Sequence, residues 1–446
     1  MSTKIQVDTL LHPDWILTQN AQRQVLTDHS LAITQGVISH ILPRQAALHL
    51  AANHTLHLQG HALIPGLLNL HGHAAMALLR GLADDIPLNR WLNEHIWPAE
   101  NALLSAEFVA TGTTLAIAEM LRSGTTCYAD HYLFPEATVA PITTSGIRAH
   151  LFCPVIDVPT RWTANASEAI ARALALHQRL AEHPRIAVGL GPHAPYTVSD
   201  ASLTAVLEAA TAHDMLIQMH VHETQHEVDQ SIAQFGVRPI ARLHTLGFLQ
   251  PRLQCVHMVA LDANDLSLMQ HSGAAVVHCP ESNLKLASGF CPVTDLLSHN
   301  IPLALGTDGA ASNNDLDMIS EMRTAALIAK GSTRDAQAFS AQQAFDCATL
   351  QGAQILRQGH RIGSLEVGKQ ADIVALDWRS IELQPIYNPI SQLVYATQRE
   401  QVVQVWIEGQ QVLKDRNPTG IDLASLQQNI LHWQAEVQRV TRGSAP

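Results

Sequence analysis

Hydrophobic and polar residues follow three successive patterns along the chain, and the first covers residues 1 to about 60. Short apolar runs there are separated by turn signals such as Gln35-Gly36, which is typical of β-strands. The expected strands are residues 4–10, 15–17, 30–34, 37–42 and 55–58. Short strands at this even spacing predict a small β-sandwich.

In the second pattern, from residue 63 to 364, apolar runs of strand length alternate with segments of helical periodicity. The expected strands are residues 63–70, 124–128, 148–155, 186–190, 216–220, 254–257, 274–278 and 302–305. Helices are expected at residues 106–121, 166–181, 200–212, 227–234, 264–270 and 317–328. Because this alternation favours a parallel sheet and eight units favour a closed one, the region predicts an α/β fold, a (β/α)8 TIM-type barrel.

The third pattern, from residue 365 to 446, returns to short strands and finishes in a helix. The expected strands are residues 371–376, 402–407 and 411–413. Neither end of the chain has enough strands for a stable sheet of its own. We therefore expect residues 1–62 and 365–446 to form one small β-sandwich domain beside the barrel of residues 63–364.

The composition narrows the class of protein. Hydrophobic residues make up 47% and charged residues 15% of the chain, which suits a compact enzyme rather than a disordered chain. The net charge of −12 argues against binding to nucleic-acid phosphates. The six cysteines form no C-x-x-C pair, and the sequence shows neither a signal peptide nor a long apolar run. We expect a cytoplasmic protein with no membrane or nucleic-acid partner.

The first candidate for chemistry is the segment that ends in His71-Gly72-His73. In a β-strand, residues two apart face the same side, so both imidazoles can bind one metal ion. By itself this pattern is weak, because a chain with 26 histidines contains such pairs by chance. Its weight depends on the other strands.

Four of the expected barrel strands carry ligand-type residues at or just beyond their carboxyl ends. Catalytic groups of such barrels lie at that face. These residues are His71, His73, His220, His257 and Asp308. Any one of them could be a hydrogen-bonded core histidine or a helix-capping aspartate, but the set together predicts a metal centre.

A rival pattern, H-E-x-x-H, occurs at His222–His226 and is the signature of zinc proteases. It works only if both histidines lie on one helix, whereas the preceding residues read as a strand. Thr224 followed by Glu227 resembles a capping box, which would start the helix inside the motif. We therefore interpret Glu223 as a loop carboxylate near His220. The H-x-E with P-C-x-x-C pattern of nucleobase-editing deaminases is also missing.

Seven long stretches carry a resemblance to a known family. They are PGLLNLHGHAAMALLRG at 65–81, EMLRSGTTCYAD at 119–130, GPHAPYTVS at 191–199, MHVHET at 219–224, VHCPESNLKLASG at 277–289, GTDGAASNNDLDMISEMR at 306–323 and IGSLEVGKQADIVALD at 362–377. With these, the chain resembles the amidohydrolase superfamily, in its 5-methylthioadenosine/S-adenosylhomocysteine deaminase branch, which is related to the chlorohydrolases. The resemblance covers nearly the whole sequence.

The resemblance implies a role for each residue at the strand ends. His71, His73, His220 and Asp308 would bind one divalent ion, usually Zn²⁺, with Fe²⁺ as the alternative. Glu223 would shuttle protons, His257 would orient or polarise the attacking water, and Asp308 would accept the proton of that water. The strand at 186–190 has no lysine at its end, which agrees with the single-metal version of the family.

The resemblance also implies substrate-binding residues. It places a ribose-binding acid at Glu100 and a substrate-binding histidine at His193. The segment 80–99, with Trp91, would cover the pocket and offer an apolar surface to a purine or thioether. Without the resemblance, Glu100 would read as a solvated loop residue and the aromatic residues as ordinary core.

The branch usually binds the homocysteine carboxylate with arginine, and Arg148 and Arg161 are the candidates in this sequence. The expected activity is metal-dependent hydrolysis of a C–N bond in a cyclic amidine. It would convert methylthioadenosine and S-adenosylhomocysteine, both purine nucleosides, to their inosine analogues and ammonia.

Two alternatives stay open. The first is a deaminase or chlorohydrolase of the same barrel that acts on guanine, cytosine or an s-triazine, which has no ribose for Glu100 to hold. The second is a catalytically silent scaffold barrel, which would need a degraded metal site, whereas every expected ligand is present. The sequence does not decide the physiological substrate, or whether the protein is a homo-oligomer.

Overall fold

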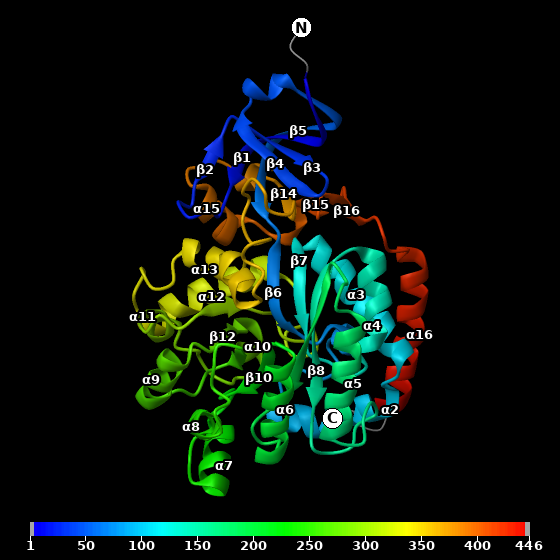
Figure 1. Ribbon diagram of the computed structural model, residues 1–446, viewed down its shortest axis with the longest axis vertical. Helices are drawn as coiled ribbons and strands as arrows, with labels where there is room; N and C mark the ends of the chain where they lie inside the picture. Colours follow the sequence, from blue (N-terminus) through cyan, green and yellow to red (C-terminus); the bar gives the residue numbers. More distant parts are fainter. Residues whose placement is uncertain (1–3, 442–446) are drawn as a thin grey trace.

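The computed structural model describes residues 4–441 and contains a parallel barrel with a separate mixed sheet above it (Figure 1). Within these residues, eight consecutive strands pair in sequence order, every neighbour parallel. They are β6 (Leu67–Gly72), β7 (Thr125–Asp130), β8 (Arg148–Val155), β9 (Ile186–Pro192), β10 (Ile217–Val221), β11 (Leu253–His257), β12 (Ala275–His278) and β13 (Leu303–Leu305). The predicted (β/α)8 architecture is confirmed.

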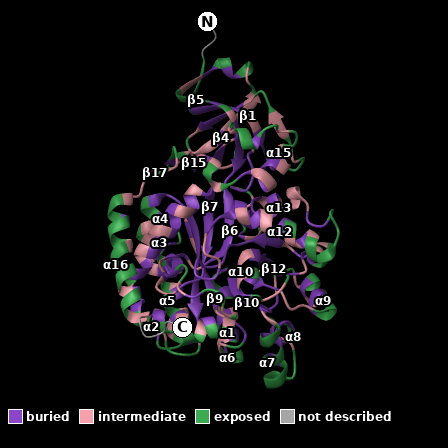
Figure 2. Ribbon diagram, turned by 180° about the vertical axis from the view of Figure 1, so that it is seen from behind, coloured by how far each residue is buried: buried purple, intermediate pink, exposed green. Residues whose placement is uncertain are grey.

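Helices surround these strands and bury them on both faces, so the strands form the purple centre of Figure 2. The barrel helices are α3 (Ala106–Arg122), α4 (Pro135–Ser145), α5 (Ala166–Arg179), α6 (Asp200–Ala212), α7 (Gln225–Phe235), α8 (Pro239–Thr245), α9 (Ala263–Ser272), α10 (Pro280–Lys285), α11 (Val293–Ser298), α12 (Met318–Thr333), α13 (Ala341–Cys347) and α14 (Leu350–Ile355). Several begin at polar caps: the side chains of Ser105, Asn165 and Ser199 each accept a backbone N–H three residues on.

Shorter helices and the last helix lie outside this ring. They are α1 (Leu88–Arg90), a π-helical turn (Trp91–Ile96), α2 (Trp97–Leu103), α15 (Pro389–Ser391) and α16 (Leu423–Thr441). Between residues 4 and 441, no single helix is both long and apolar enough to span a membrane. Leu88–Leu103 and Ala106–Arg122 reach that length and hydropathy only when taken together, and the chain bends by 115° between them.

The barrel closes between its first and last strands through residues just beyond β13. The Asp308 N–H donates to the His71 carbonyl at 3.0 Å, and the Thr307 N–H donates to the Asn69 side chain at 3.0 Å. Gly306 permits this approach, because a Cβ there would lie 2.7 Å from the His71 nitrogen. The seam therefore brings Asp308 next to His71.

The two ends of the chain join in the second sheet, as predicted. Its strands are β1 (Ile5–Leu17), β2 (Val25–Thr27), β3 (His29–Thr34), β4 (Val37–Pro43), β5 (Leu50–Pro65), β14 (Ile373–Asp377), β15 (Val402–Ile407), β16 (Gln410–Lys414) and β17 (Asn417–Pro418). Antiparallel pairing of β5 with β14 connects the two ends. In the described part of the chain, hydrogen bonds join these strands into one continuous sheet.

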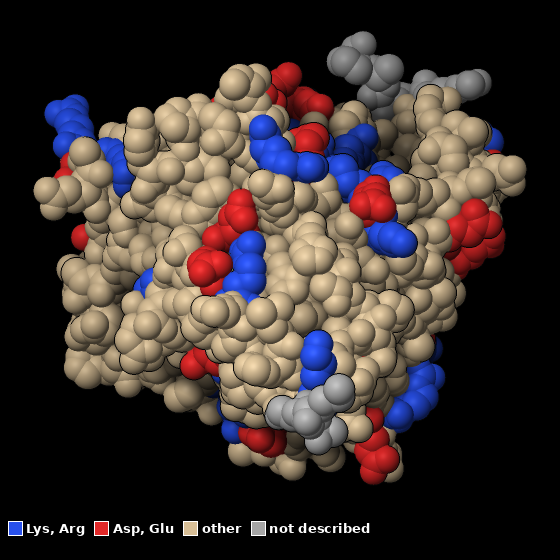
Figure 3. Space-filling view, turned by 90° about the horizontal axis from the view of Figure 1, so that it is seen from above, with Lys and Arg blue, Asp and Glu red and all other residues tan. Residues whose placement is uncertain are grey.

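This sheet bends far enough for distant turns to touch. The turn at Gly36 between β3 and β4 lies against Glu408, which precedes β16. Leu11, Ile33, Leu63 and Trp406 belong to the apolar core of the sheet. The face of the molecule seen from above in Figure 3 carries acidic and basic groups next to one another among a majority of uncharged residues.

The expected strand 63–70 is in fact two strands that belong to different sheets. Leu63 and Pro65 pair with β14, whereas the barrel strand begins at Leu67. The change occurs at Gly66, where a Cβ would lie 2.0 Å from the Thr126 hydroxyl. The sequence shows one apolar run because both strands are buried.

Candidate active site

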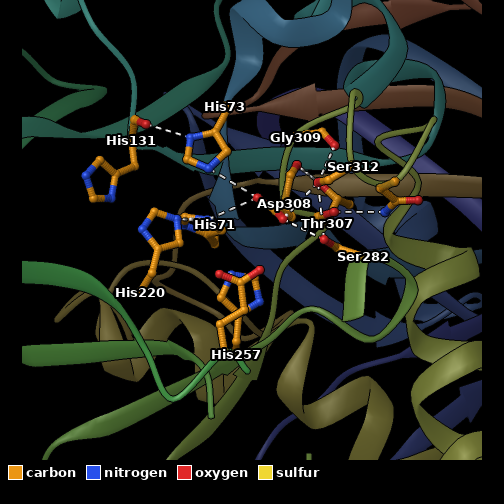
Figure 4. Close-up of polar contacts among 12 residues, drawn as sticks. His71, His73, His131, His220, His257, Ser282, Thr307, Asp308, Gly309 and Ser312 are labelled. Atoms are coloured by element: carbon orange, nitrogen blue, oxygen red, sulfur yellow. Dashed lines mark hydrogen bonds and ion pairs between the residues drawn. The ribbon is translucent and has the colours of Figure 1, made fainter. Parts of the chain in front are cut away.

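Four side chains meet at the carboxyl end of the barrel, where one ligand atom from each lies within 4.8 Å of the others (Figure 4). His71 and His73 come from the end of β6, His220 from β10, and Asp308 from the loop after β13. The Asp308 Oδ1 is 3.3 Å from the His71 Nε2 and 3.2 Å from the His73 Nε2, and the Nε2 atoms of His71 and His220 are 3.2 Å apart. The structure thus brings the four predicted ligands to one point.

The other ring nitrogen of each histidine has its own partner. The His73 Nδ1 lies 2.6 Å from the His131 carbonyl, and the His220 Nδ1 lies 2.7 Å from the His193 carbonyl. A carbonyl only accepts, so these Nδ1 atoms carry the proton and, in a neutral imidazole, Nε2 keeps its lone pair. The His71 Nδ1 lies 2.7 Å from the Gln218 Oε1.

The second oxygen of Asp308 is held by two hydroxyl groups. Ser282 donates to Oδ2 at 2.6 Å and Ser312 donates to it at 2.8 Å. Burial raises the pKa of Asp308, but its contacts with His71 and His73 outweigh burial and hold the pKa well below its usual range. The carboxylate is therefore ionised, with Oδ1 turned toward the histidines.

This set of donors fits a divalent cation. Burial lowers the pKa of His71 to about 4 and lowers that of His220 well below its usual range, so both rings are neutral. Burial would also lower the pKa of His73, yet Asp308 raises it overall, so the carboxylate draws positive charge to this point. Three imidazole nitrogens and one carboxylate oxygen match the ligands that zinc-type ions take.

Glu223 and His257 lie beside the four ligands, with the His257 Nε2 3.8 Å from the Glu223 Oε2. The His257 Nδ1 lies 2.9 Å from the Asn283 Oδ1, which fixes the ring. Burial, assisted by the charge of Asp308, raises the pKa of Glu223 to about 8. Glu223 is thus a buried acid that can hold a proton at neutral pH.

The loop that carries Glu223 explains the H-E-x-x-H pattern. Helix α7 begins at Gln225, and its cap Thr224 accepts the Glu227 N–H. Instead of closing a capping box, the Glu227 carboxylate accepts the N–H groups of His222 and Glu223, each at 2.9 Å. His222 therefore precedes the helix, and the two histidines of the motif do not share a helix face.

A cavity of about 290 Å³ opens from the metal ligands toward α1 and α2. Glu100 lies in its wall and accepts a hydrogen bond of 2.5 Å from the Tyr132 hydroxyl, and burial raises the pKa of Glu100 to about 7. His193 lies there too, with its Nδ1 3.0 Å from the Thr197 hydroxyl. Trp91 lines the same cavity and is buried.

The two candidate arginines lie at opposite ends of the barrel. Arg161 lines the cavity, and its guanidinium donates to the carbonyls of Leu104 and Asn101. Arg148 lies at the start of β8, far from the carboxyl ends, and is buried in an ion pair of 2.6 Å with Asp372. The prediction that Arg148 could bind the substrate is therefore wrong, because the first residue of a parallel strand faces the other end.

Several residues of the site were not expected from the sequence. They are Gln218, His131, Tyr132, Ser282, Asn283 and Ser312. His131 directly follows β7, so the rule applied to the other strand ends could have found it. The serines and amides carry no such signal, because their roles depend on which strands are neighbours.

Comparisons with known proteins agree with this geometry. Residues 62–412 match the family model described as "Amidohydrolase family". A 5-methylthioadenosine/S-adenosylhomocysteine deaminase of Teredinibacter turnerae is 44% identical over 98% of this chain and 99% of its own length, and one of Saccharophagus degradans is 43% identical over 98% of each.

Solved structures are similar as well. An adenosine deaminase from Xanthomonas campestris with bound zinc has a TM-score of 0.95 and 46% identity, over 98% of this chain and all of that one. A triazine hydrolase from Arthobacter aurescens has a TM-score of 0.89 over 96% of this chain and 99% of its own, but only 20% identity. The second likeness shows the shared fold alone.

Proposed function

The chain belongs to the amidohydrolase family, and on that basis we propose that it deaminates the adenine ring of 5-methylthioadenosine and S-adenosylhomocysteine. The products are the inosine analogues and ammonia. One observation carries the proposal: a single cavity reaches from the cluster of three histidines and an aspartate to a buried acid with a raised pKa, Glu223, and to a second carboxyl group in its wall, Glu100.

We propose Zn²⁺ as the resident ion, in preference to Fe²⁺, held by His71, His73, His220 and Asp308. The zinc in the related adenosine deaminase structure supports this choice. When bound, such an ion lowers the pKa of a water molecule from about 15.7 to near 7 and so supplies a nucleophile at neutral pH.

The chain's own residues then move the protons. Asp308 accepts a proton from the water whose oxygen bonds to C6 of the purine, and Glu223 donates its proton to N1. His257, whose Nδ1 proton is held by Asn283, accepts a hydrogen bond at Nε2 from the hydroxyl group added at C6. The bond from C6 to the amino nitrogen breaks after this nitrogen receives the proton held by Asp308, and ammonia leaves. Glu223 regains a proton from N1 or the new hydroxyl group.

The outer half of the cavity would bind the sugar and its 5′ substituent. Glu100 would accept hydrogen bonds from the ribose hydroxyls, which are charge-assisted when the carboxylate is ionised. Trp91 would contact the purine or thioether, and His193 would accept a hydrogen bond from the substrate at its free ring nitrogen. Arg161, which lines the cavity, would meet a homocysteine carboxylate.

An assay of ammonia release tests this function directly. The panel contains methylthioadenosine, S-adenosylhomocysteine, adenosine, guanine, cytosine and a chlorotriazine, with zinc content measured on the same preparation. We expect the first two to have the highest kcat/KM at about one zinc per chain. Preference for a free base or the triazine would contradict the proposed substrates. Activity on none of them, with zinc bound, would support the silent scaffold.

We also propose a cytoplasmic location. All six cysteines are free thiols buried in the described structure, which suits a reducing compartment. Fractionation of cells that express the tagged protein would test this, and a periplasmic or secreted product would contradict it.

A further inference from the structure

The three metal-binding histidines are held in two different ways. His73 and His220 are each held at Nδ1 by a backbone carbonyl, whereas His71 is held at Nδ1 by a side chain, Gln218. Backbone carbonyls stay in place when side chains change. Among these three ligands, His71 is therefore the one whose orientation a single substitution can release.

The contacts of Gln218 determine which of its atoms faces His71. Its Nε2 lies 2.8 Å from the Leu70 carbonyl, and a carbonyl can only accept. The amide NH₂ group must therefore point toward Leu70, and Oε1 must point toward the His71 Nδ1. As Oε1 also only accepts, His71 carries its proton on Nδ1 and presents the Nε2 lone pair to the ion.

A second glutamine continues this contact into the barrel. The Gln218 Nε2 also donates to the Gln254 Oε1 at 2.9 Å, and both side chains are almost completely buried. The Gln254 Nε2 has no protein partner within residues 4–441. The chain of contacts thus runs from His71 to Gln218 and ends at Gln254.

Packing alone does not account for these amides. Leu216 and Val256, two residues away on the same strands, face the same side and belong to the apolar cluster inside the barrel. Burying an amide among such residues is costly unless its polar atoms are paired. A methionine would fill similar space without that cost, so the hydrogen bond to His71 is the physical reason for a glutamine.

We propose that Gln218 is a positioning residue of the metal site: it fixes the tautomer and ring orientation of His71, and through them the affinity for the ion. Gln254 supports Gln218 but is not essential to it, because the Leu70 carbonyl already determines how the Gln218 amide is turned. Removing such a partner of a ligand histidine weakens metal binding by about 10–100-fold.

The test measures metal affinity rather than turnover. Competition with a chromogenic chelator gives the Zn²⁺ dissociation constant of the full-length protein and of three variants. Gln218→Met removes the oxygen that accepts from His71 and keeps the side-chain volume. Gln218→Asn keeps an amide group, but its side chain is one methylene shorter, so the amide oxygen lies farther from His71. Both should weaken Zn²⁺ binding at least about tenfold. Gln218→Glu, buried as the protonated acid, keeps an acceptor oxygen for His71 and a donor for the Leu70 carbonyl, and should stay within about threefold of the parent protein.

Gln254→Met is the matched control in the same interior. It should change the dissociation constant by less than about threefold, because Gln218 keeps its contacts with His71 and Leu70. If Gln218→Met fails to fold, the comparison of Gln218→Asn with Gln218→Glu still decides the matter.

Equal Zn²⁺ affinity in Gln218→Asn, Gln218→Glu and the parent protein would overturn the proposal, as would an equal loss in Gln218→Asn and Gln254→Met. The absorption spectrum of the Co²⁺-loaded protein gives a second readout, and it should change in Gln218→Asn but not in Gln254→Met. Neither measurement uses a substrate, so both stand even if the proposed nucleoside substrates are wrong.

Discussion

The two ends of the barrel both bury charged groups but complete their contacts differently. At the base, the Arg148 guanidinium meets both oxygens of Asp372, at 2.6 and 3.1 Å, and the Glu408 N–H adds a third donor at 2.8 Å. At the other end, three imidazoles and Asp308 converge on one point. The buried charges at the base find their partners within the chain, whereas the ligand atoms at the other end are arranged for a cation.

This difference separates structural from functional burial. A buried polar group whose partners all lie in the protein contributes to the fold, and its loss is felt as instability. A buried group directed at a point where the chain supplies only acceptors and lone pairs is placed for a ligand. The four predictions below test the distinction, and the largest effect comes first.

Glu223→Gln should lower kcat by roughly a thousandfold, because it removes the acid that protonates N1. The substitution keeps the volume and should leave zinc content and thermal stability nearly unchanged. Steady-state kinetics with metal analysis on the same samples measures both. Turnover close to the parent value would remove Glu223 from the mechanism.

The pH profile adds a check on the same residue. Burial raises the pKa of Glu223 to about 8, so the acid is protonated at neutral pH and ionises as pH rises through this value. Turnover of the parent protein should decline over that range, and a bound cation, which favours the carboxylate, moves the decline to lower pH. Glu223→Gln should lack the decline.

Arg148→Met should have the opposite outcome at the base of the barrel. It leaves Asp372 buried without its cation, which costs about 3 kcal/mol of folding free energy. The urea midpoint should fall while zinc content and kcat of the folded protein stay unchanged. Adding Asp372→Asn should recover part of the stability. A folded Arg148→Met protein with a lower kcat would contradict a purely structural role for Arg148.

Glu100→Ala should have the smallest effect, and only on the kcat/KM of substrates that carry a ribose. Loss of hydrogen bonds to a carboxylate should lower kcat/KM for nucleosides about tenfold and leave the free adenine base unaffected. Tyr132→Phe removes the hydroxyl group that donates a hydrogen bond to Glu100, and it should lower kcat/KM for nucleosides less than Glu100→Ala does. An equal loss for nucleoside and free base would show that Glu100 does not hold ribose.

Sequence patterns predicted the fold well where they are repetitive. All eight barrel strands were expected within a few residues, since each is an apolar run bounded by helical periodicity. The four ligands could be found because strand ends of a barrel share one face, so His220 and Asp308 could be related to His71 without knowing any distance.

What the sequence could not supply depends on three-dimensional neighbours. Arg148 is a candidate by residue type alone, whereas its place as the first residue of β8 puts it at the base of the barrel. Gln218 contacts His71 from across the barrel and Ser282 contacts Asp308 from the neighbouring strand end, and nothing in their local sequence marks them. The split at Gly66 is hidden because both strands there are equally apolar.

The seam between the first and last barrel strands has a consequence for the order of assembly. During synthesis the ribosome delivers His71 and His73 long before Asp308. The hydrogen bond from the Asp308 N–H to the His71 carbonyl forms only when the final strand docks, and it is this contact that brings the carboxylate to the histidines. A chain that ends before residue 308, or whose last strand has not docked, has at most three of the four ligands. The complete metal site therefore exists only after the barrel has closed.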